Sequence, residues 1–252
     1  MRTNLALARM RAGQPALGAA AELGAPLAAE LLASRGFDWI LVDDQHGVWD
    51  DQTSMQAYRG VFLGNSVPIV RVQCNDYSTI GRALDRGALG VIVPMVNSAQ
   101  DARAAAYAMR YPPRGGRSMG LVGVGFMLSD YAQWANDQLF LAVQIETKEA
   151  VQHAEEILAV EGVDGCWVGP ADLALSMGID LNTPEGRAAH DDAILSVIAA
   201  CKRTGKIPGL AATPQNAQRW IDRGMLFINC CTDIDFVLSG ATELLRTLGR
   251  GA

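Results

Sequence analysis

Two short stretches determine how this chain is interpreted: Val-Gln-Ile-Glu-Thr at residues 143–147 and Gly-Pro-Ala-Asp at residues 169–172. Each comes at the end of an apolar run typical of a buried strand, and each delivers a carboxylate, Glu146 or Asp172, where the run stops. Because neighbouring parallel strands end at the same edge of a sheet, the two acids are expected to lie close together. Such a pair is able to hold one divalent cation.

A strand followed by a helix recurs along the whole chain. Strands are expected at residues 16–21, 39–43, 68–71, 90–94, 140–145, 165–168, 207–210 and 226–229. Helices are expected at residues 25–35, 51–63, 78–86, 98–109, 130–138, 148–158, 184–204, 214–223 and 233–248, with a polar turn after residue 172. This alternation predicts an α/β fold, a (β/α)8 TIM barrel, with a doubly wound open sheet as the second choice. The length of 252 residues suits one barrel, so a single domain over residues 1–252 is predicted.

The composition argues against several classes of function. A net charge of −6, a pI near 5.1 and the lack of a basic run disfavour a nucleic-acid partner. No stretch approaches the roughly 18 uninterrupted apolar residues of a membrane span, so no membrane partner is expected and a soluble cytoplasmic protein is predicted. The 5 cysteines are an odd number without a CxxC pair, which indicates reduced thiols. Adjacent Cys230 and Cys231 are interpreted as part of a strand end rather than as a redox pair.

Polar residues gather at the predicted carboxyl ends of the strands, where a barrel carries its chemistry. Asp43 ends the second strand and His46 follows it, Arg71 ends the third, and Glu146 and Asp172 follow the fifth and sixth. Singly, each has an ordinary structural explanation as a turn cap, an ion-pair partner or the first carboxylate of a helix. Together on one rim they favour an active site.

The histidine and lysine counts narrow the chemistry. Of 3 histidines, His153 and His190 fall within predicted helices, which leaves His46 alone at the rim. A zinc site of three histidines, or of two histidines and a glutamate, cannot then be built, whereas two carboxylates and water suit Mg2+ or Mn2+. Lys148 is the lysine nearest to the rim and it starts a helix, so Schiff-base chemistry is disfavoured.

Several motifs occur along the chain in a familiar order. They are Leu41–His46, Val70–Val72, Gly87–Met95, Tyr111–Arg117, Gln144–Thr147, Glu161–Gly165 and Gly169–Leu173. With them the chain resembles, from about residue 15 to 245, the HpcH/HpaI family of metal-dependent class II pyruvate aldolases, similar to hydroxy-heptenedioate and 2-keto-3-deoxy-sugar-acid aldolases. The resemblance implies a carbon–carbon lyase that reversibly joins the enolate of a pyruvate-type 2-oxo acid, pyruvate or hydroxypyruvate, to an aldehyde.

The resemblance also assigns roles to residues of the rim. Glu146 and Asp172 would bind the divalent metal (Mg2+, Mn2+ or Co2+), and no organic cofactor is implied. Arg71 would contact the keto oxygen of the 2-oxo acid. His46 paired with Asp43 would be the acid/base dyad.

The remaining roles concern substrate binding and assembly. Gln144 would position water at the metal. In the segment Gly169, Pro170, Ala171 and Asp172, the backbone N–H groups of the last two residues would receive the substrate carboxylate, as the start of a helix favours. Family members are commonly hexamers, so a homo-oligomer is expected, with Asp85 contributing across a subunit contact.

Three features depart from the family pattern. Gln45 stands where Glu is usual, Leu121–Leu128 is more apolar than expected, and Cys230–Cys231 replaces a small-residue pair. These departures are expected to alter the aldehyde preference rather than the central chemistry. In the irregular loop from residue 111, Arg114 and Arg117 are expected to meet an anionic substrate, to form ion pairs within the loop or to lie at a subunit contact.

Two other functions fit the same residues. A decarboxylase, or a lyase of acyl-CoA or citrate-lyase type, would act on a related 2-oxo or hydroxy acid through the same kind of enolate. A non-catalytic barrel that binds a 2-oxo acid, as a sensor or an assembly subunit, is the remote alternative.

Overall fold

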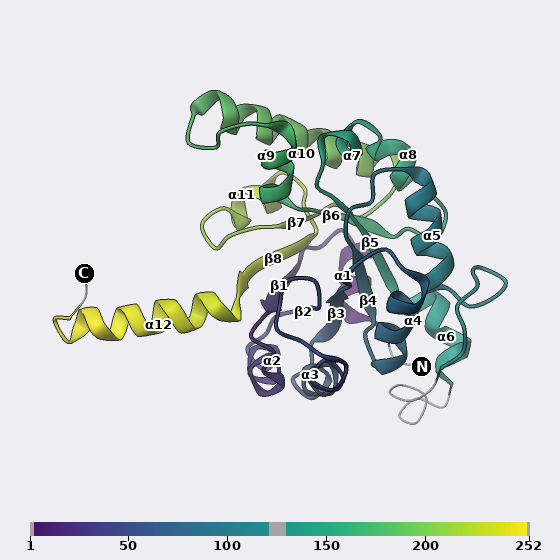
Figure 1. The fold of residues 1–252 in the computed structure, drawn as a ribbon, viewed down its shortest axis with the longest axis horizontal. Helices are drawn as coiled ribbons and strands as arrows, with labels where there is room; N and C mark the ends of the chain where they lie inside the picture. Colours follow the sequence, from purple (N-terminus) through teal and green to yellow (C-terminus); the bar gives the residue numbers. More distant parts are fainter. Residues whose placement is uncertain (1–2, 121–129, 251–252) are drawn as a thin grey trace.

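The strands close into a complete parallel barrel. The structure, a computed structural model, describes residues 3–120 and 130–250. Its strands pair in chain order and β8 pairs with β1, so the predicted (β/α)8 class is confirmed and the open sheet is excluded (Figure 1). The strands are β1 Ala16–Ala21, β2 Trp39–Asp43, β3 Val67–Arg71, β4 Gly90–Val93, β5 Phe140–Ile145, β6 Gly165–Val168, β7 Gly209–Ala211 and β8 Phe227–Thr232.

Helices alternate with the strands around the barrel. Several begin at a capping side chain: Asp50, Asp76 and Ser98 each accept hydrogen bonds from N–H groups in the first turn of the helix that follows. In the described ranges no helix is long and apolar enough to cross a membrane. The helices are α1 Leu5–Arg11, α2 Pro26–Ala33, α3 Asp51–Leu63, α4 Tyr77–Arg86, α5 Ala99–Met109, α6 Tyr131–Gln138, α7 Lys148–Gln152, α8 Ala154–Leu158, α9 Pro170–Met177, α10 Pro184–Thr204, α11 Ala217–Asp222 and α12 Asp233–Thr247.

Some elements differ from the predicted ranges. The residues after position 172 form α9 rather than a polar turn, because Pro170 suits the first helical position, and α9 ends at Gly178 with φ 66°. The helix predicted at 148–158 is divided into α7 and α8 at His153, although backbone hydrogen bonds continue across that residue. The strand predicted from residue 207 starts at Gly209, since Pro208 has no N–H to donate. The sequence interpretation also missed α1 and started α11 too early.

Strand register brings the polar rim to one level. Asp43 at the end of β2 lies opposite Arg71 at the end of β3, and Gln144 on β5 lies opposite Trp167 on β6. Each of these strands runs in the same direction, so their carboxyl ends open on the same side of the barrel. The predicted placement of these residues at a single rim follows from that register.

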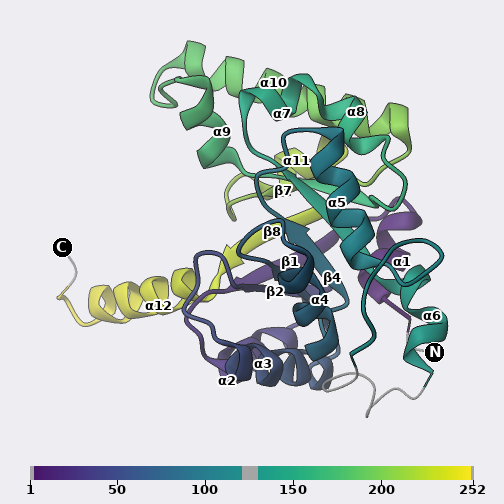
Figure 2. The same ribbon diagram turned by 45° about the vertical axis from the view of Figure 1, so that its right-hand side comes forward.

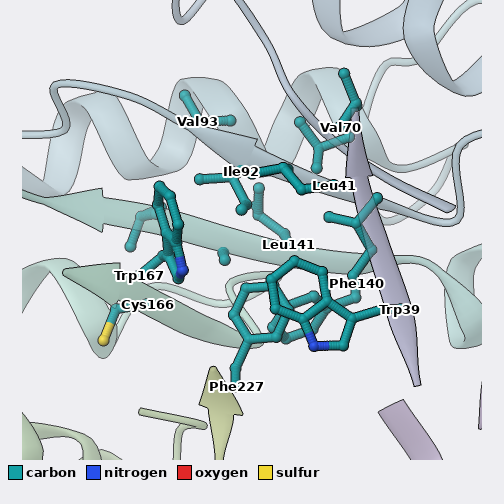
Figure 3. Packing of buried hydrophobic residues seen from close by; sticks show 14 of the residues in the cluster. Trp39, Leu41, Val70, Ile92, Val93, Phe140, Leu141, Cys166, Trp167 and Phe227 are labelled. Carbon is teal, nitrogen blue, oxygen red and sulfur yellow. The ribbon is translucent and has the colours of Figure 1, made fainter. Parts of the chain in front are cut away.

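Large aromatic side chains fill the barrel interior below the rim (Figure 3). Trp39 stacks on Phe227 with ring centroids 4.2 Å apart, and Phe140 meets Phe227 edge-on at 4.8 Å. Gly18 makes room for Trp39, because a Cβ on Gly18 would lie 2.2 Å from Trp39 Cε2. The indole nitrogen of Trp39 donates to the Ala16 carbonyl at 3.1 Å. This packed layer closes the barrel beneath the site.

The last helix, α12, stands away from its own barrel. Figures 1 and 2 show it extending outward from the end of β8, with the C-terminus at its far end. Its first residue anchors it, since the Asp233 carboxylate accepts hydrogen bonds from the backbone N–H groups of Glu22 and Leu23 at 2.9 and 3.1 Å. Beyond that turn its apolar side chains are exposed: Phe236, Val237, Leu238, Leu244, Leu245 and Leu248.

Replacing Gly18 by Ala is expected to destabilise the barrel, because the added methyl group would overlap the Trp39 ring. Denaturant titration should show a loss of about 1–3 kcal/mol in the free energy of unfolding. Gly81→Ala is the matched control: a Cβ there meets nothing within 4 Å, and its place inside α4 predicts a gain of about 0.5–1 kcal/mol. Equal effects of the two substitutions would contradict the packing described.

Candidate active site

A cavity of about 1080 Å3 opens at the carboxyl ends of the strands. Asp43 and Glu146 are buried behind its lining and hydrogen-bonded to lining residues. The structure thus brings together side chains from β2, β3, β5 and the start of α9, as the sequence predicts. The predicted site residues that line the cavity are His46, Arg71, Gln144, Gly169, Pro170, Ala171 and Asp172.

Asp43 and Arg71 form a buried ion pair across two strands. Arg71 donates through Nε to one carboxylate oxygen of Asp43 at 2.8 Å and through Nη2 to the other. The backbone N–H groups of Gln45 and His46 donate to the same carboxylate at 3.2 and 3.4 Å. A bidentate pair fixes the plane of a guanidinium. The pair uses Nε and Nη2 of Arg71, so Nη1 makes no hydrogen bond to the described residues. The Arg71 side chain lines the cavity.

The predicted dyad of His46 and Asp43 is not formed as a contact between side chains. Both oxygens of Asp43 are occupied by Arg71 and by backbone N–H groups, and one of those N–H groups is that of His46 itself. The imidazole of His46 is exposed, lines the cavity and makes no hydrogen bond to the described part of the chain. His46 is therefore placed by its backbone, with its ring free to meet a ligand.

Glu146 is a buried acid at the end of β5 with only 2% of its surface exposed. One oxygen accepts from the backbone N–H of Met95 at 2.8 Å, and the other accepts from the Gln144 amide. Burial raises the pKa of Glu146, and the hydrogen bond from Met95 opposes that rise. The nearby charge of Asp172 raises the pKa of Glu146 further. The backbone of Met95, which supplies this N–H, has φ at 55°, an unusual value for a residue other than glycine. The site thus concentrates negative charge in a shielded position.

The start of α9 presents unpaired backbone donors to the cavity. No side chain caps this helix at Gly169, and Pro170 occupies its first turn, so the N–H groups of Ala171 and Asp172 are the free ones. His190 lies on α10 and its Nε2 is 2.9 Å from the Pro170 carbonyl. The sequence interpretation treated His190 as an ordinary helix residue, but it fixes the position of this turn.

Asp85 lies on α4 and belongs to another part of the molecule. Its carboxylate accepts from the buried guanidinium of Arg117 at 2.6 Å, and Arg117 also donates to the Tyr131 hydroxyl at 2.9 Å. Arg114 pairs with Asp137 at 2.6 Å. Within the described chain both loop arginines are thus ion-paired, and Asp85 does not reach its own cavity, so a role across a subunit contact stays a prediction. The apolar stretch Leu121–Leu128 lies outside the described residues.

The lysines lie outside the cavity as expected, whereas one cysteine reaches it. Lys148 is exposed at the start of α7 and does not line the cavity. Lys206 donates to the Val163 carbonyl at 2.7 Å near the start of the strands. All 5 cysteines are free thiols, and Cys230 and Cys231 belong to β8. Cys231 lines the cavity, which the sequence interpretation did not anticipate.

Three further cavity residues were not predicted from the sequence. Glu22 follows β1, Trp167 lies on β6 and Asn229 lies on β8, and all three line the cavity. The ring of Trp167 lies 5.3 Å from the Arg71 guanidinium carbon. Alternate residues of a barrel strand face inward, so a polar or aromatic residue at such a position of a predicted strand could have indicated a cavity residue. Glu22 could not have been found in this way, because the predicted strand ends one residue earlier, at residue 21.

Comparison with known proteins decides the family. The HpcH/HpaI aldolase/citrate lyase model matches residues 21–239. The chain belongs to this family. It is 40% identical to 4-hydroxy-2-oxo-heptane-1,7-dioate aldolase of Escherichia coli over 257 residues, covering 97% of this chain and 95% of that one. The predicted assignment to the aldolases, a class of carbon–carbon lyases, is thereby confirmed.

Solved structures agree with the fold. A family member from Burkholderia cenocepacia J2315 superposes with a TM-score of 0.90 at 32% identity, covering 98% of this chain and 99% of that one. A citrate lyase β subunit from M. tuberculosis, complexed with oxaloacetate and magnesium, superposes with a TM-score of 0.60 at 15% identity, covering 89% and 94%. The second likeness concerns the fold alone.

Asp44, which follows the ion-paired Asp43, is expected to make stability depend on pH. Burial raises its pKa to about 6 from an ordinary value of 3.8, while the hydrogen bond from Ser54 opposes that rise. The folded state then holds the proton more tightly, so the free energy of unfolding falls as the pH rises from about 4 to about 6. Asp44→Asn should remove this fall and stabilise the protein at pH 7 by about 1–3 kcal/mol.

Denaturant titrations of both proteins from pH 4 to 7 measure this effect. The difference between Asp44→Asn and the unchanged chain should grow through that range, because the amide keeps the Ser54 contact without a charge. Asp50→Asn provides a control with the opposite sign, since hydrogen bonds at its exposed helix cap lower the pKa of Asp50. A constant difference for Asp44→Asn over the whole range would contradict the assignment.

Proposed function

We propose that the chain catalyses the reversible addition of the enolate of a pyruvate-type 2-oxo acid to an aldehyde, with a divalent cation as cofactor. Glu146 carries the proposal. It is a buried carboxylate that forms no ion pair with the described residues, and it stands close enough to Asp172 for the two charges to repel. Glu146 is buried and Asp172 is exposed at the cavity, and a cation between two such acids would neutralise their charge.

The residues present suit a hard cation such as Mg2+, Mn2+ or Co2+. No group of three His, Cys, Asp or Glu side chains able to hold a metal occurs in the described ranges, so a closed site of the zinc type is not built. Two carboxylates completed by water are a normal magnesium arrangement. Gly169 keeps the space over Glu146 open, since a Cβ there would lie 2.8 Å from Glu146 Oε2. When bound, the cation would supply Lewis-acid chemistry to the substrate oxygens.

The chain's own residues would bind and orient the 2-oxo acid. The free N–H groups of Ala171 and Asp172 would receive its carboxylate, as the start of a helix favours an anion. Arg71, fixed by Asp43, would donate through Nη1 to the keto oxygen, where negative charge develops as the C3 proton leaves. Gln144 Oε1 is buried without a partner in the described chain and would accept a hydrogen bond from water at the site.

Proton transfer at C3 is the role proposed for His46. Its imidazole lines the cavity and is free of hydrogen bonds to the described residues, which suits a group that exchanges protons with substrate or water. The space available also favours an aldol reaction over decarboxylation. The cavity extends past these residues toward β7, β8 and β1, and a second substrate would fit in that volume, which the decarboxylation of one small acid would leave unused.

The assembly and the location are part of the same proposal. We infer one domain over residues 1–252, because all eight strands close in a single barrel. A homo-oligomer, a hexamer by the family resemblance, would cover the exposed apolar side chains of α12 and bring Asp85 to a neighbouring cavity. Five free thiols suit a cytoplasmic location.

Deuterium exchange at the methyl group of pyruvate in D2O tests the proposed chemistry without any aldehyde. Exchange followed by proton NMR should depend on added Mg2+, Mn2+ or Co2+ and stop with EDTA. Glu146→Gln should slow it by at least about a hundredfold, because the proposed cation would lose one of its two charged ligands. Glu149→Gln, an exposed acid on α7, is the control. Full exchange in EDTA would exclude the cation.

Arg71→Ala is expected to lower kcat/KM for aldol cleavage by at least about a hundredfold, as for the loss of one oxyanion donor. The loss should fall mainly on kcat, because the guanidinium acts on charge that develops during the reaction. Arg114→Ala, which removes an exposed ion-paired guanidinium of the loop, should leave turnover within about twofold. A change in KM alone for Arg71→Ala would assign the residue to substrate binding instead.

A further inference from the structure

The cavity has a second half that the proposed 2-oxo acid site leaves unused. The residues given roles above come from β2 to β6 and the start of α9. The opposite wall is built from β7, β8 and the end of β1, where small side chains keep the space open: Ala20, Ala211 and Ala212. Within this wall two polar side chains stand out, Asn229 and Glu22.

Asn229 is a buried amide without a partner. It is 6% exposed, its Oδ1 is buried, and neither side-chain polar atom forms a hydrogen bond with the described residues. In the strand register it lies opposite Gly18 on β1 and Ala211 on β7, and neither residue carries a polar side chain that could pair with the amide. An unpaired buried amide is unfavourable unless a bound group completes its hydrogen bonds. Trp167 lines the same cavity, and its Nε1 is a second buried donor with no partner in residues 3–120 and 130–250.

The charge of this half of the cavity is negative. The Glu22 carboxylate forms no hydrogen bond or ion pair in the described chain, and Asp235 and Glu243 line the outer part of the same space. The nearby cations are already paired, Arg71 with Asp43 and Arg246 with Glu243 at 2.8 Å. Burial raises the pKa of Glu22, and the nearby charge of Asp43 raises that pKa further. This position therefore already disfavours negative charge.

We propose that this half of the cavity binds the aldehyde. Asn229 and Glu22 would select a short uncharged aldehyde with a hydroxyl group on the first or second carbon from its carbonyl group. The inference rests on the proposed function. The amide of Asn229 both donates to and accepts from a hydroxyl, and the Glu22 carboxylate accepts from one. The bond formed joins C3 of the 2-oxo acid to the aldehyde carbon, and the aldehyde oxygen takes up a proton equivalent to the one that leaves C3.

The same residues disfavour an aldehyde that carries a carboxylate. Cleavage between C3 and C4 of a 4-hydroxy-2-oxo-heptanedioate, the compound that names the Escherichia coli relative, releases pyruvate and an aldehyde with a terminal carboxylate. In this chain such a carboxylate would enter beside Glu22 without a free cation on the described walls. Repulsion between like charges in a partly buried pocket discriminates strongly against it.

Three aldehydes distinguish the acceptor classes: glyceraldehyde, propionaldehyde and succinic semialdehyde. Addition of each to pyruvate is measured as kcat/KM with the full-length protein and added Mn2+. The kcat/KM for glyceraldehyde should exceed the other two values by at least about tenfold. Propionaldehyde should react more slowly because it leaves Asn229 unpaired, and succinic semialdehyde because it carries a negative charge. Equal values, or a preference for the semialdehyde, would overturn the inference.

Variants of the two residues test their separate roles. Asn229→Ala should lower the ratio of glyceraldehyde to propionaldehyde by about tenfold, and Glu22→Gln should raise the relative rate with the semialdehyde by about the same factor. Each ratio is internal to one protein, so a partly unfolded variant does not distort it. Asn182→Ala and Glu149→Gln, both outside the cavity lining, should keep the original ratios. Unchanged ratios in both cavity variants would overturn the assignment.

Failure of the inference is distinguishable from failure of the proposed function. If pyruvate exchanges its methyl protons but the ratios contradict the expectation, the acceptor assignment is wrong and the enolate chemistry stands. If pyruvate shows neither exchange nor addition with any metal, the proposed function fails and the acceptor assignment falls with it.

Discussion

The buried ion pair between Asp43 and Arg71 is the interaction on which the rim depends. Removing two charges from water is costly unless their remaining hydrogen bonds are made, and here the carboxylate receives two guanidinium contacts and two backbone N–H groups. Loss of either partner would leave an uncompensated buried charge, a change that costs about 3–5 kcal/mol. The same contacts determine the site's chemistry. They orient Arg71 toward the cavity and leave the His46 ring unbound.

The polar groups of the cavity fall into two sets, one on each side. On one side, two acids stand close together near a fixed guanidinium and the free N–H groups of α9, an arrangement that suits a cation and an anionic substrate. On the other side, an amide and a carboxylate that have no partner among the described residues face space left by alanines. Polar atoms without partners are normally removed from a barrel interior by evolution toward apolar packing. Their presence on both sides of this cavity indicates that ligands complete them.

The sequence predicted the barrel and most of the rim, because both depend on local patterns. Alternating strands and helices identify the fold, and residues at strand ends such as Glu146 and Arg71 necessarily share one edge. The sequence did not predict which side chains form hydrogen bonds with each other, because that depends on how the strands are aligned. Asp43 was expected to orient His46, yet it pairs with Arg71, which lies directly opposite in the strand register. The buried amide of Asn229 was missed because its isolation appears only when the neighbouring strands are in place.

The position of α12 links assembly to the outer edge of the site. Asp233 ties the first turn of this helix to the backbone after β1, but beyond that turn its apolar side chains are exposed. Asp235 and Glu243 on the same helix nevertheless line the cavity. A helix with such an apolar stripe is stabilised by covering that stripe. A partner that packed against α12, as in the proposed homo-oligomer, would therefore also fix the two carboxylates that border the proposed aldehyde pocket. Assembly and acceptor choice would then be coupled through one helix.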